Sequence, residues 1–203
     1  MEYLLLIWYI NTFDKNSIVI SYLLAVKDLA EGIKVGQFFD FTALKRLATN
    51  SNNLDSLMEI SISSFNKMDS YLREQNRSNV SSLIVAGTWI EGLYITGSVI
   101  EETKNKELID RLGEQKDIVN ILLIILENYK NDPNFTELST YLQELKNLYS
   151  KVKITTEFSE PKKMEVDGSL IIVQDEISHV EITPEQVTKI INQIKKIRKY
   201  IVS

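Results

Sequence analysis

Residues 79–103 read NVSSLIVAGTWIEGLYITGSVIEET, and this stretch decides the fold that the sequence predicts. Drawn as a helix, it places apolar side chains in almost every direction, and such a helix is typically buried among others. Residues 53–75 precede it and repeat apolar side chains at spacings of three and four, which lines one face of another helix. The turn-forming residues 76–79 (NRSN) lie between the two segments, so we expect an antiparallel helical hairpin at the centre of the molecule.

Helices are also predicted on both sides of this hairpin. Proline is absent before Pro133, so long helices are permitted over the first two thirds of the chain. Gly32 is expected to end the second helix as its left-handed C-terminal residue. The predicted helices cover residues 1–11, 16–31, 40–48, 53–75, 79–103, a segment reaching about residue 130 with a kink near Gly113, 133–152, and 183–201.

Two short stretches with alternating apolar residues, 152–158 and 170–182, lie before the last helix. They either pair as a small β-hairpin within 152–182 or form a loop. The last helix has a strong start, with Thr183 as its cap and Pro184 at its first position. The fold class that we predict is mainly α: an up-and-down helical bundle of seven to eight helices in a single domain over residues 1–203, with this hairpin as an appendage.

The composition excludes several classes of function. The chain has no cysteine and one histidine, His179, which excludes disulfides, thiolate metal sites, a cysteine nucleophile and any site with two imidazoles. With 23 basic and 28 acidic residues the net charge is −5, so no general field attracts nucleic acid. His179 lies in an acid-rich segment without a nucleophile motif, and we expect it to be exposed and structural. We expect no metal, no cofactor and no nucleic-acid partner, while the oligomeric state stays open.

Glu91 is the first candidate for a functional residue, because it lies in the middle of the apolar stretch GTWIEGLYITG. Burying an isolated carboxylate costs several kcal/mol unless the group is paired, hydrogen-bonded or protonated. In the predicted hairpin it faces the neighbourhood of Ser61 and Ser64, and Tyr94 lies one turn further on. Two interpretations stay open: a buried polar network that fixes the helix register, or a carboxylate that binds a ligand or acts as an acid or base.

Arg77 and Trp89 complete the set of candidate binding residues. Arg77 lies in the predicted turn, about 21 Å along the helix from Glu91, so the two cannot pair within that element. Its guanidinium suits either the last carbonyls of a helix or recognition of an anion. Trp89 suits either the core or a stacking surface, and its neighbours are aliphatic.

No uninterrupted apolar run reaches the roughly 20 residues of a membrane-spanning helix. The longest runs, 3–10 and 118–126, are expected to be buried helix. Residues 186–203 carry five basic side chains and no acid, a pattern that suits either a solvated helix face or an anionic membrane surface. The opening MEYLLLIWYIN has Glu2 where a signal peptide has its basic region, and no small-residue cleavage site follows.

Three stretches together resemble a family of Bacteroidetes proteins of unknown function that are described as lipoproteins: NNLDSLMEISISSFNKMDSYLREQNR, SSLIVAGTWIEGLYI and ITPEQVTKIINQIKKIRKYI. The resemblance is greatest over residues 50–100, and GTWIEGLYI is its most specific part. It implies a helical protein tethered to the bacterial cell envelope, with no catalytic residues to carry over. Such relatives should have a signal peptide and a lipidated cysteine, which this sequence lacks. We therefore expect either a start downstream of the natural one or a cytoplasmic member of the family.

The function expected from these observations is noncatalytic. A binding or scaffold protein of the cell envelope, with an unknown ligand or protein partner, agrees with the resemblance and with the lack of a catalytic motif. Contact with a membrane would come through a lipid anchor that this chain does not contain. The alternative is a carboxylate-dependent enzyme that uses Glu91, for example one acting on glycosides, because paired acids from different helices leave no local motif.

Overall fold

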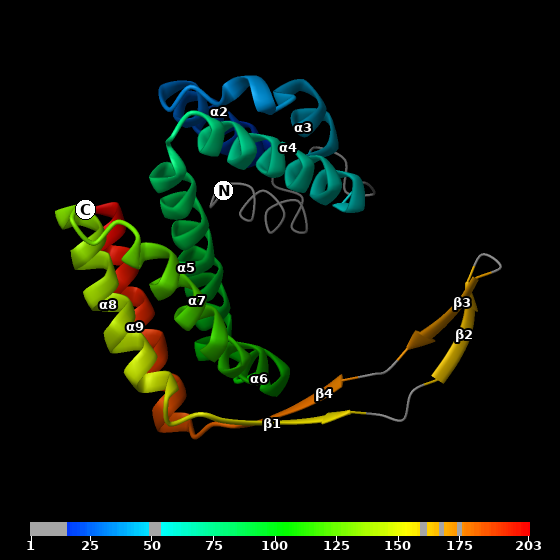
Figure 1. Cartoon of the computed structure of the whole chain (residues 1–203), viewed down its shortest axis with the longest axis vertical. Coiled ribbons are helices and arrows are strands. Elements are labelled where there is room, and N and C mark those ends of the chain that lie inside the picture. The colour runs from blue at the N-terminus through cyan, green and yellow to red at the C-terminus, as the bar shows by residue number, and fades with distance from the viewer. Residues whose placement is uncertain (1–15, 49–53, 159–161, 167–168, 174–175) are drawn as a thin grey trace. The chain divides into compact units, whose positions relative to one another are not determined.

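The computed structural model describes residues 16–48, 54–158, 162–166, 169–173 and 176–203 (Figure 1). The described elements are α2 Asn16–Gly32, the 3-10 helix η1 Gly36–Phe38, α3 Phe41–Ala48, α4 Leu54–Glu74, α5 Ser78–Thr103, α6 Lys106–Glu114, α7 Lys116–Glu127, α8 Pro133–Tyr149, β1 Lys153–Phe158, β2 Lys162–Val166, β3 Ser169–Val173, β4 Glu176–Glu181 and α9 Pro184–Val202. The prediction of a mainly α-helical bundle with a small hairpin before the last helix is confirmed. The predicted helix over 1–11 lies outside the described residues.

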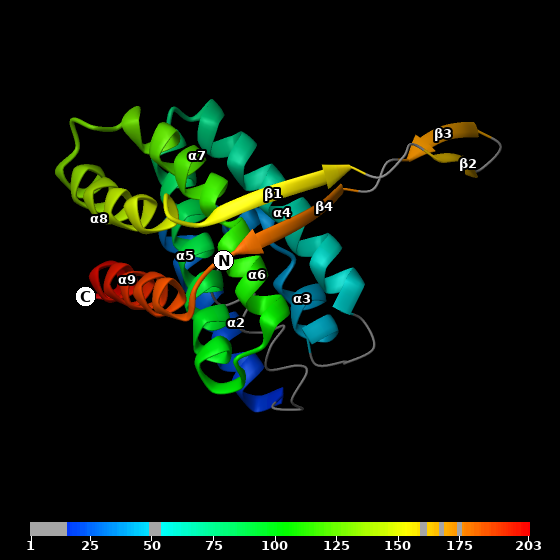
Figure 2. The same ribbon diagram turned by 90° about the horizontal axis from the view of Figure 1, so that it is seen from below.

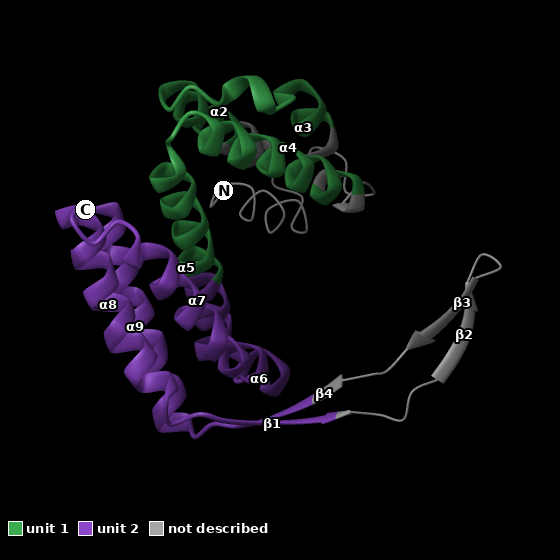
Figure 3. Ribbon diagram, viewed as in Figure 1, with its two compact units in different colours: residues 1–92 green, residues 93–203 purple. Residues whose placement is uncertain are grey.

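The chain divides into two compact units, residues 1–92 and 93–203, with the boundary inside α5 (Figure 3). Unit 1 contains α2, η1, α3, α4 and the first half of α5, and unit 2 contains the remaining elements. Because α5 passes through this boundary as one helix, the division does not by itself define two domains. The single-domain organisation stays a prediction.

The core of unit 1 forms where the apolar faces of α2, α3 and α4 meet around η1. Its buried side chains are Leu23, Ala30, Val35, Phe39, Leu44, Met68 and Leu72. The ring of Phe39 lies edge-on to that of Phe65, with 5.5 Å between their centroids. This geometry is the one that aromatic quadrupoles favour.

The end of α2 differs from the sequence prediction. Lys34, and not Gly32, adopts the left-handed conformation, with φ of 60°. The N–H of Val35 donates to the carbonyl of Ala30 (2.8 Å), which is the outer hydrogen bond of a Schellman motif. The buried side chain of Val35 accounts for this difference. The chain continues two residues beyond Gly32 before it turns, and this places Val35 in the core.

The antiparallel packing of α5 along α4 stays a prediction. Figure 1 shows the two helices at an angle to each other, and Figure 2 shows both leading away from their common turn. Near the turn the two helices are joined by a hydrogen bond from the hydroxyl of Ser81 to the carboxylate of Asp69.

Burial of α5 on all sides was a wrong prediction. Only 33% of its most apolar window is buried, and Leu83 and Val85 are 39% and 44% exposed. By length and composition alone α5 is apolar enough to cross a membrane, a criterion that core helices of soluble proteins also meet.

In unit 2 the helices α7, α8 and α9 pack side by side in sequence order. Their facing residues recur at helical spacing and are buried: Val119, Leu122, Leu126, Phe135, Leu138, Leu142, Leu145, Tyr149, Val187, Ile190, Ile191, Ile194 and Ile197. The predicted start of α9 is confirmed, since Thr183 and Gln186 form a reciprocal capping box. The buried hydroxyl of Tyr149 donates to the carbonyl of Leu112 (2.9 Å) and so ties α8 to α6.

The segment predicted as one kinked helix near Gly113 is two helices, α6 and α7, which meet at Gln115. Gly113 lies at the close approach of α6 to β4, because a Cβ atom there would overlap Cγ1 of Val180. A second glycine, Gly97, faces α9, where a Cβ would lie 3.2 Å from Cγ1 of Ile191. The absence of a side chain therefore permits close packing at both positions.

The two alternating stretches before α9 do form strands. β1 pairs with β4 and β2 with β3, both antiparallel, so the chain makes one long interrupted hairpin (Figure 2). Three residues (159–161) separate β1 from β2, and two residues (174–175) separate β3 from β4. The pairing register therefore shifts by one residue between the two ladders. Val180 and Ser178 alternate with the exposed His179, as the period of two predicts.

Candidate functional site

Glu91 is buried, with 6% of its surface exposed, and Ser64 is equally buried at 5%. Glu91, Ser61 and Trp89 each take part in a hydrogen bond, ion pair, ring contact or electrostatic interaction, so none of the three is without a partner. The neighbouring hydroxyls of Thr88 and Ser98 are not available as donors to Glu91. Each donates to the carbonyl four residues earlier in α5 (2.8 and 2.9 Å), and a hydroxyl has one hydrogen to donate. A buried, partnered carboxylate favours the structural interpretation of Glu91.

Arg77 caps a helix end. Its Nη1 donates to the carbonyl of Ile33 at 2.9 Å, just beyond the end of α2. This contact ties the α4–α5 turn to α2 and agrees with a guanidinium bonded to terminal helix carbonyls. Tyr94 belongs to unit 2, where the guanidinium carbon of Arg198 lies 4.3 Å from the centre of its ring. This distance is that of a cation–π contact. Both side chains are thus engaged in contacts that join helices.

Among the described residues, no three His, Asp or Glu side chains gather where they could hold a metal ion. His179 is exposed on β4, with its Nε2 3.9 Å from a carboxylate oxygen of Glu157 across the ladder. The exposed position predicted for this histidine is confirmed.

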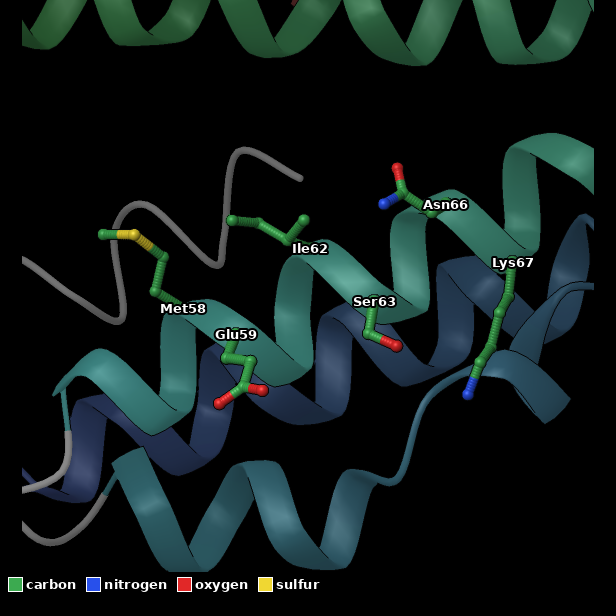
Figure 4. A pocket seen from close by; sticks show the side chains of 6 residues that line it. All are labelled: Met58, Glu59, Ile62, Ser63, Asn66 and Lys67. Atoms are coloured by element: carbon green, nitrogen blue, oxygen red, sulfur yellow. The ribbon is translucent and has the colours of Figure 1, made fainter. Parts of the chain in front are cut away.

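A surface hollow of about 650 Å³ lies along α4 (Figure 4). Its described lining comes from this one helix, and Met58 and Ile62 are each 53% exposed there. In Figure 4 these two side chains point away from Glu59 and Lys67, so polar groups do not converge on an apolar centre. A ligand site normally has such convergence.

Each unit also holds an apolar cavity. The cavity in unit 1, about 210 Å³, is walled by apolar side chains of its core, among them Phe39, Phe65 and Ile84. The cavity in unit 2 measures about 300 Å³ and lies between the end of α5, α6 and the start of α9. We call it the α5–α9 cavity. It differs from the first cavity in having charged side chains at its rim.

Local turns of the chain build the α5–α9 cavity. α5 ends at Thr103, and the next residue, Lys104, has a left-handed φ of 52° and donates its N–H to the carbonyl of Ile100 (2.9 Å). Asn105 then caps α6, its side chain accepting from the N–H of Leu108 (3.1 Å), and the chain reverses. The capping box at Thr183 starts α9 on the other side. These ends of elements bring together the aliphatic wall: Ile100, Ile109, Ile182, Val187 and Ile191.

The polar side chains at the rim differ in whether they have a hydrogen-bond or ion-pair partner. Glu101 accepts two hydrogen bonds from Nζ of Lys195, at 2.7 and 2.6 Å, so its charge is compensated. The hydroxyl of Thr188 donates to the carbonyl of Pro184 at 2.9 Å. Lys104 also lines the rim, and within the described ranges its ammonium has no partner. One uncompensated cation therefore borders an aliphatic cavity.

Sequence reasoning missed this cavity and its residues. Its wall comes from three segments that are separated by up to 91 positions, from residue 100 to residue 191, and none of them carries a motif. The one local signal is a lysine directly after a long apolar helix, which is also an ordinary C-terminal residue of a helix.

Comparison with known proteins identifies no relative: no family model, curated protein or solved structure matches the chain. The resemblance of three stretches to a family described as lipoproteins stays a prediction, as do the envelope location and the choice of organism group.

Proposed function

We propose that this is a noncatalytic binding protein whose ligand site is the α5–α9 cavity. The observation that supports the proposal is the combination of an aliphatic wall, a volume of about 300 Å³ and the ammonium of Lys104, which has no partner among the residues that the structure describes. Ligand sites are concave and mostly apolar, with a few polar groups that fix orientation, and they begin at about this size.

The size of the cavity sets the affinity to expect. Burial of apolar surface contributes about 0.8 kcal/mol for each methylene group, so an eight-carbon chain gains roughly 6 kcal/mol before the cost of association. The gross value alone would correspond to a dissociation constant of about 40 μM, so after the cost of association we expect a weaker constant, on the order of 1 mM. Binding in this range is weak, but it is measurable by calorimetry and by thermal shift.

The test uses octanol and octanoate as probes on the full chain. A probe at about ten times its dissociation constant stabilises the native state by about 1.4 kcal/mol. For a chain of this length that raises the melting temperature by about 3–6 °C. We expect such a rise for at least one of the two probes.

A blocked variant shows where the probe binds. Thr188 is exposed at the rim, so Thr188→Trp should cover the opening without disturbing the core and should abolish the rise. Lys199→Trp places the same side chain at an exposed position of α9 that does not line the cavity, and it should keep the rise. No rise with either probe at millimolar concentration, or an equal rise in Thr188→Trp, would contradict the proposal.

We also propose a location in the bacterial cell envelope, and the support is the resemblance of the three stretches alone. Fractionation of cells that carry the gene in its natural genomic context tests this location. Recovery of the protein in the membrane or periplasmic fraction is expected, and recovery in the cytoplasm would contradict it.

A further inference from the structure

We propose that the ligand of the α5–α9 cavity is an amphiphile with one short acyl chain and an anionic head group, held at Lys104. This inference rests on the proposed function, and it adds the chemical class of the ligand.

The backbone fixes Lys104 at the rim. A left-handed residue at a helix end is usually glycine, because a Cβ atom makes this conformation costly. Here a lysine adopts it, with φ of 52°, and its N–H is bonded to the carbonyl of Ile100. The backbone of Lys104 is thus held at a defined position beside the aliphatic wall. No described side chain neutralises its ammonium group.

The other charges at the rim cancel. Glu101 is held by Lys195 through two short hydrogen bonds. The C-terminus of α5 and the N-terminus of α9 both border the cavity, and their partial charges are opposite in sign. Of the charged side chains that line the cavity, that of Lys104 is the one without a described counter-ion, and it favours an anion.

The aliphatic wall indicates that the other end of the ligand is apolar. Ile100, Val187 and Ile191 are buried, and the half-buried Ile109 and Ile182 continue the surface toward the rim. A volume of about 300 Å³ equals that of about ten water molecules in the liquid, at roughly 30 Å³ each. It suits a chain of about six to eight carbons with its head group outside, and it excludes a long or branched lipid.

The experiment compares head groups on one chain. Dissociation constants of octanoate, octyl phosphate, octanol and octylammonium are measured by calorimetry on the full chain at low salt. We expect octanoate or octyl phosphate to bind about three- to fivefold more tightly than octanol, the range of an exposed ion pair, and octylammonium to bind least. The preference should shrink as salt is added, since the Debye length falls to about 8 Å at 0.15 M.

A matched pair of variants assigns the effect to one side chain. Lys104→Gln should remove the preference for the anion and leave the octanol constant unchanged. Lys34→Gln is the control, because Lys34 is also an exposed lysine in the left-handed conformation after a helix, but it does not line the cavity. This variant should keep the preference.

The outcomes separate the two proposals. If octanol binds as tightly as both anions, the anionic head group is wrong and the proposed binding function stands. If the preference persists in Lys104→Gln, the assignment to Lys104 is wrong. If none of the four probes binds, the inference and the proposed function both fail. If only one of the anions is preferred, the inference holds and that head group identifies the source of the ligand.

Discussion

Replacing Gly113 by alanine should destabilise the protein, although alanine is the better helix former. Gly113 is buried in α6, at the point where the helix meets β4. The added methyl group would overlap Cγ1 of Val180 and would lie 3.6 Å from Cγ1 of Val152. Val180 cannot move aside easily, because it is β-branched and its strand is fixed by pairing with Ile154.

Two opposing terms set the magnitude. Alanine gains about 1 kcal/mol over glycine in a helix interior. Overpacking of a close contact costs about 1–3 kcal/mol. We therefore expect a net loss of about 1 kcal/mol in the free energy of unfolding, or a fall of about 2–4 °C in the melting temperature.

The assay is urea denaturation followed by far-UV circular dichroism, with two further variants. Gly87→Ala is the control, since nothing lies within 4 Å of the added Cβ, and it should stabilise the protein by about 0.5–1 kcal/mol. Val180→Ala removes the obstructing methyl groups, so Gly113→Ala in that background should also be stabilising. If Gly113→Ala alone stabilises the protein as much as Gly87→Ala does, the close approach of α6 and β4 is not real.

Three further substitutions test the contacts that hold the helices together. Tyr149→Phe should cost about 1 kcal/mol by removing the hydrogen bond to Leu112. Burial raises the pKa of Tyr149, so above about pH 10 the phenol loses its proton in the unfolded chain and keeps it in the folded one. Between pH 9 and 11 the free energy of unfolding of the wild type should therefore fall more steeply than that of Tyr149→Phe, as measured by denaturation. Thr183→Ala should cost about 1 kcal/mol in thermal unfolding, because it removes the cap of α9. Burial acts to raise the pKa of Asp69, but hydrogen bonds from Arg73 and Ser81 outweigh it and the pKa is lowered; Ser81→Ala should therefore raise this pKa in an NMR titration, and no change would show that the bond is not formed.

Helix positions were predictable from local signals, because each depends on residues close in the sequence. The spacing of apolar residues located α4, and the Thr183–Pro184 start located α9. The alternation in 152–158 allowed a strand but could not choose it over a loop, since a strand exists only when a partner pairs with it. That partner is β4, whose residues lie 18 to 28 positions further along the chain than the β1 residues they pair with.

The arrangement of α5 was predicted wrongly for a physical reason. The apolar composition of a helix shows that its faces can be buried. It does not show how many neighbouring helices cover those faces. The exposed Leu83 and Val85 show that the first half of α5 is only partly covered. Glu91 was correctly identified as buried.

The amino-acid sequence by itself determined that the chain is helical, where most helices begin and end, and that no cysteine or paired-histidine chemistry is available to it. These properties follow from residue types and from periods of a few positions. The tertiary structure alone decided which faces meet, that Gly113 admits a strand, and that Lys104 stands at the rim of an aliphatic cavity. Such contacts join residues many turns apart, and their geometry depends on helix crossings that no local pattern specifies.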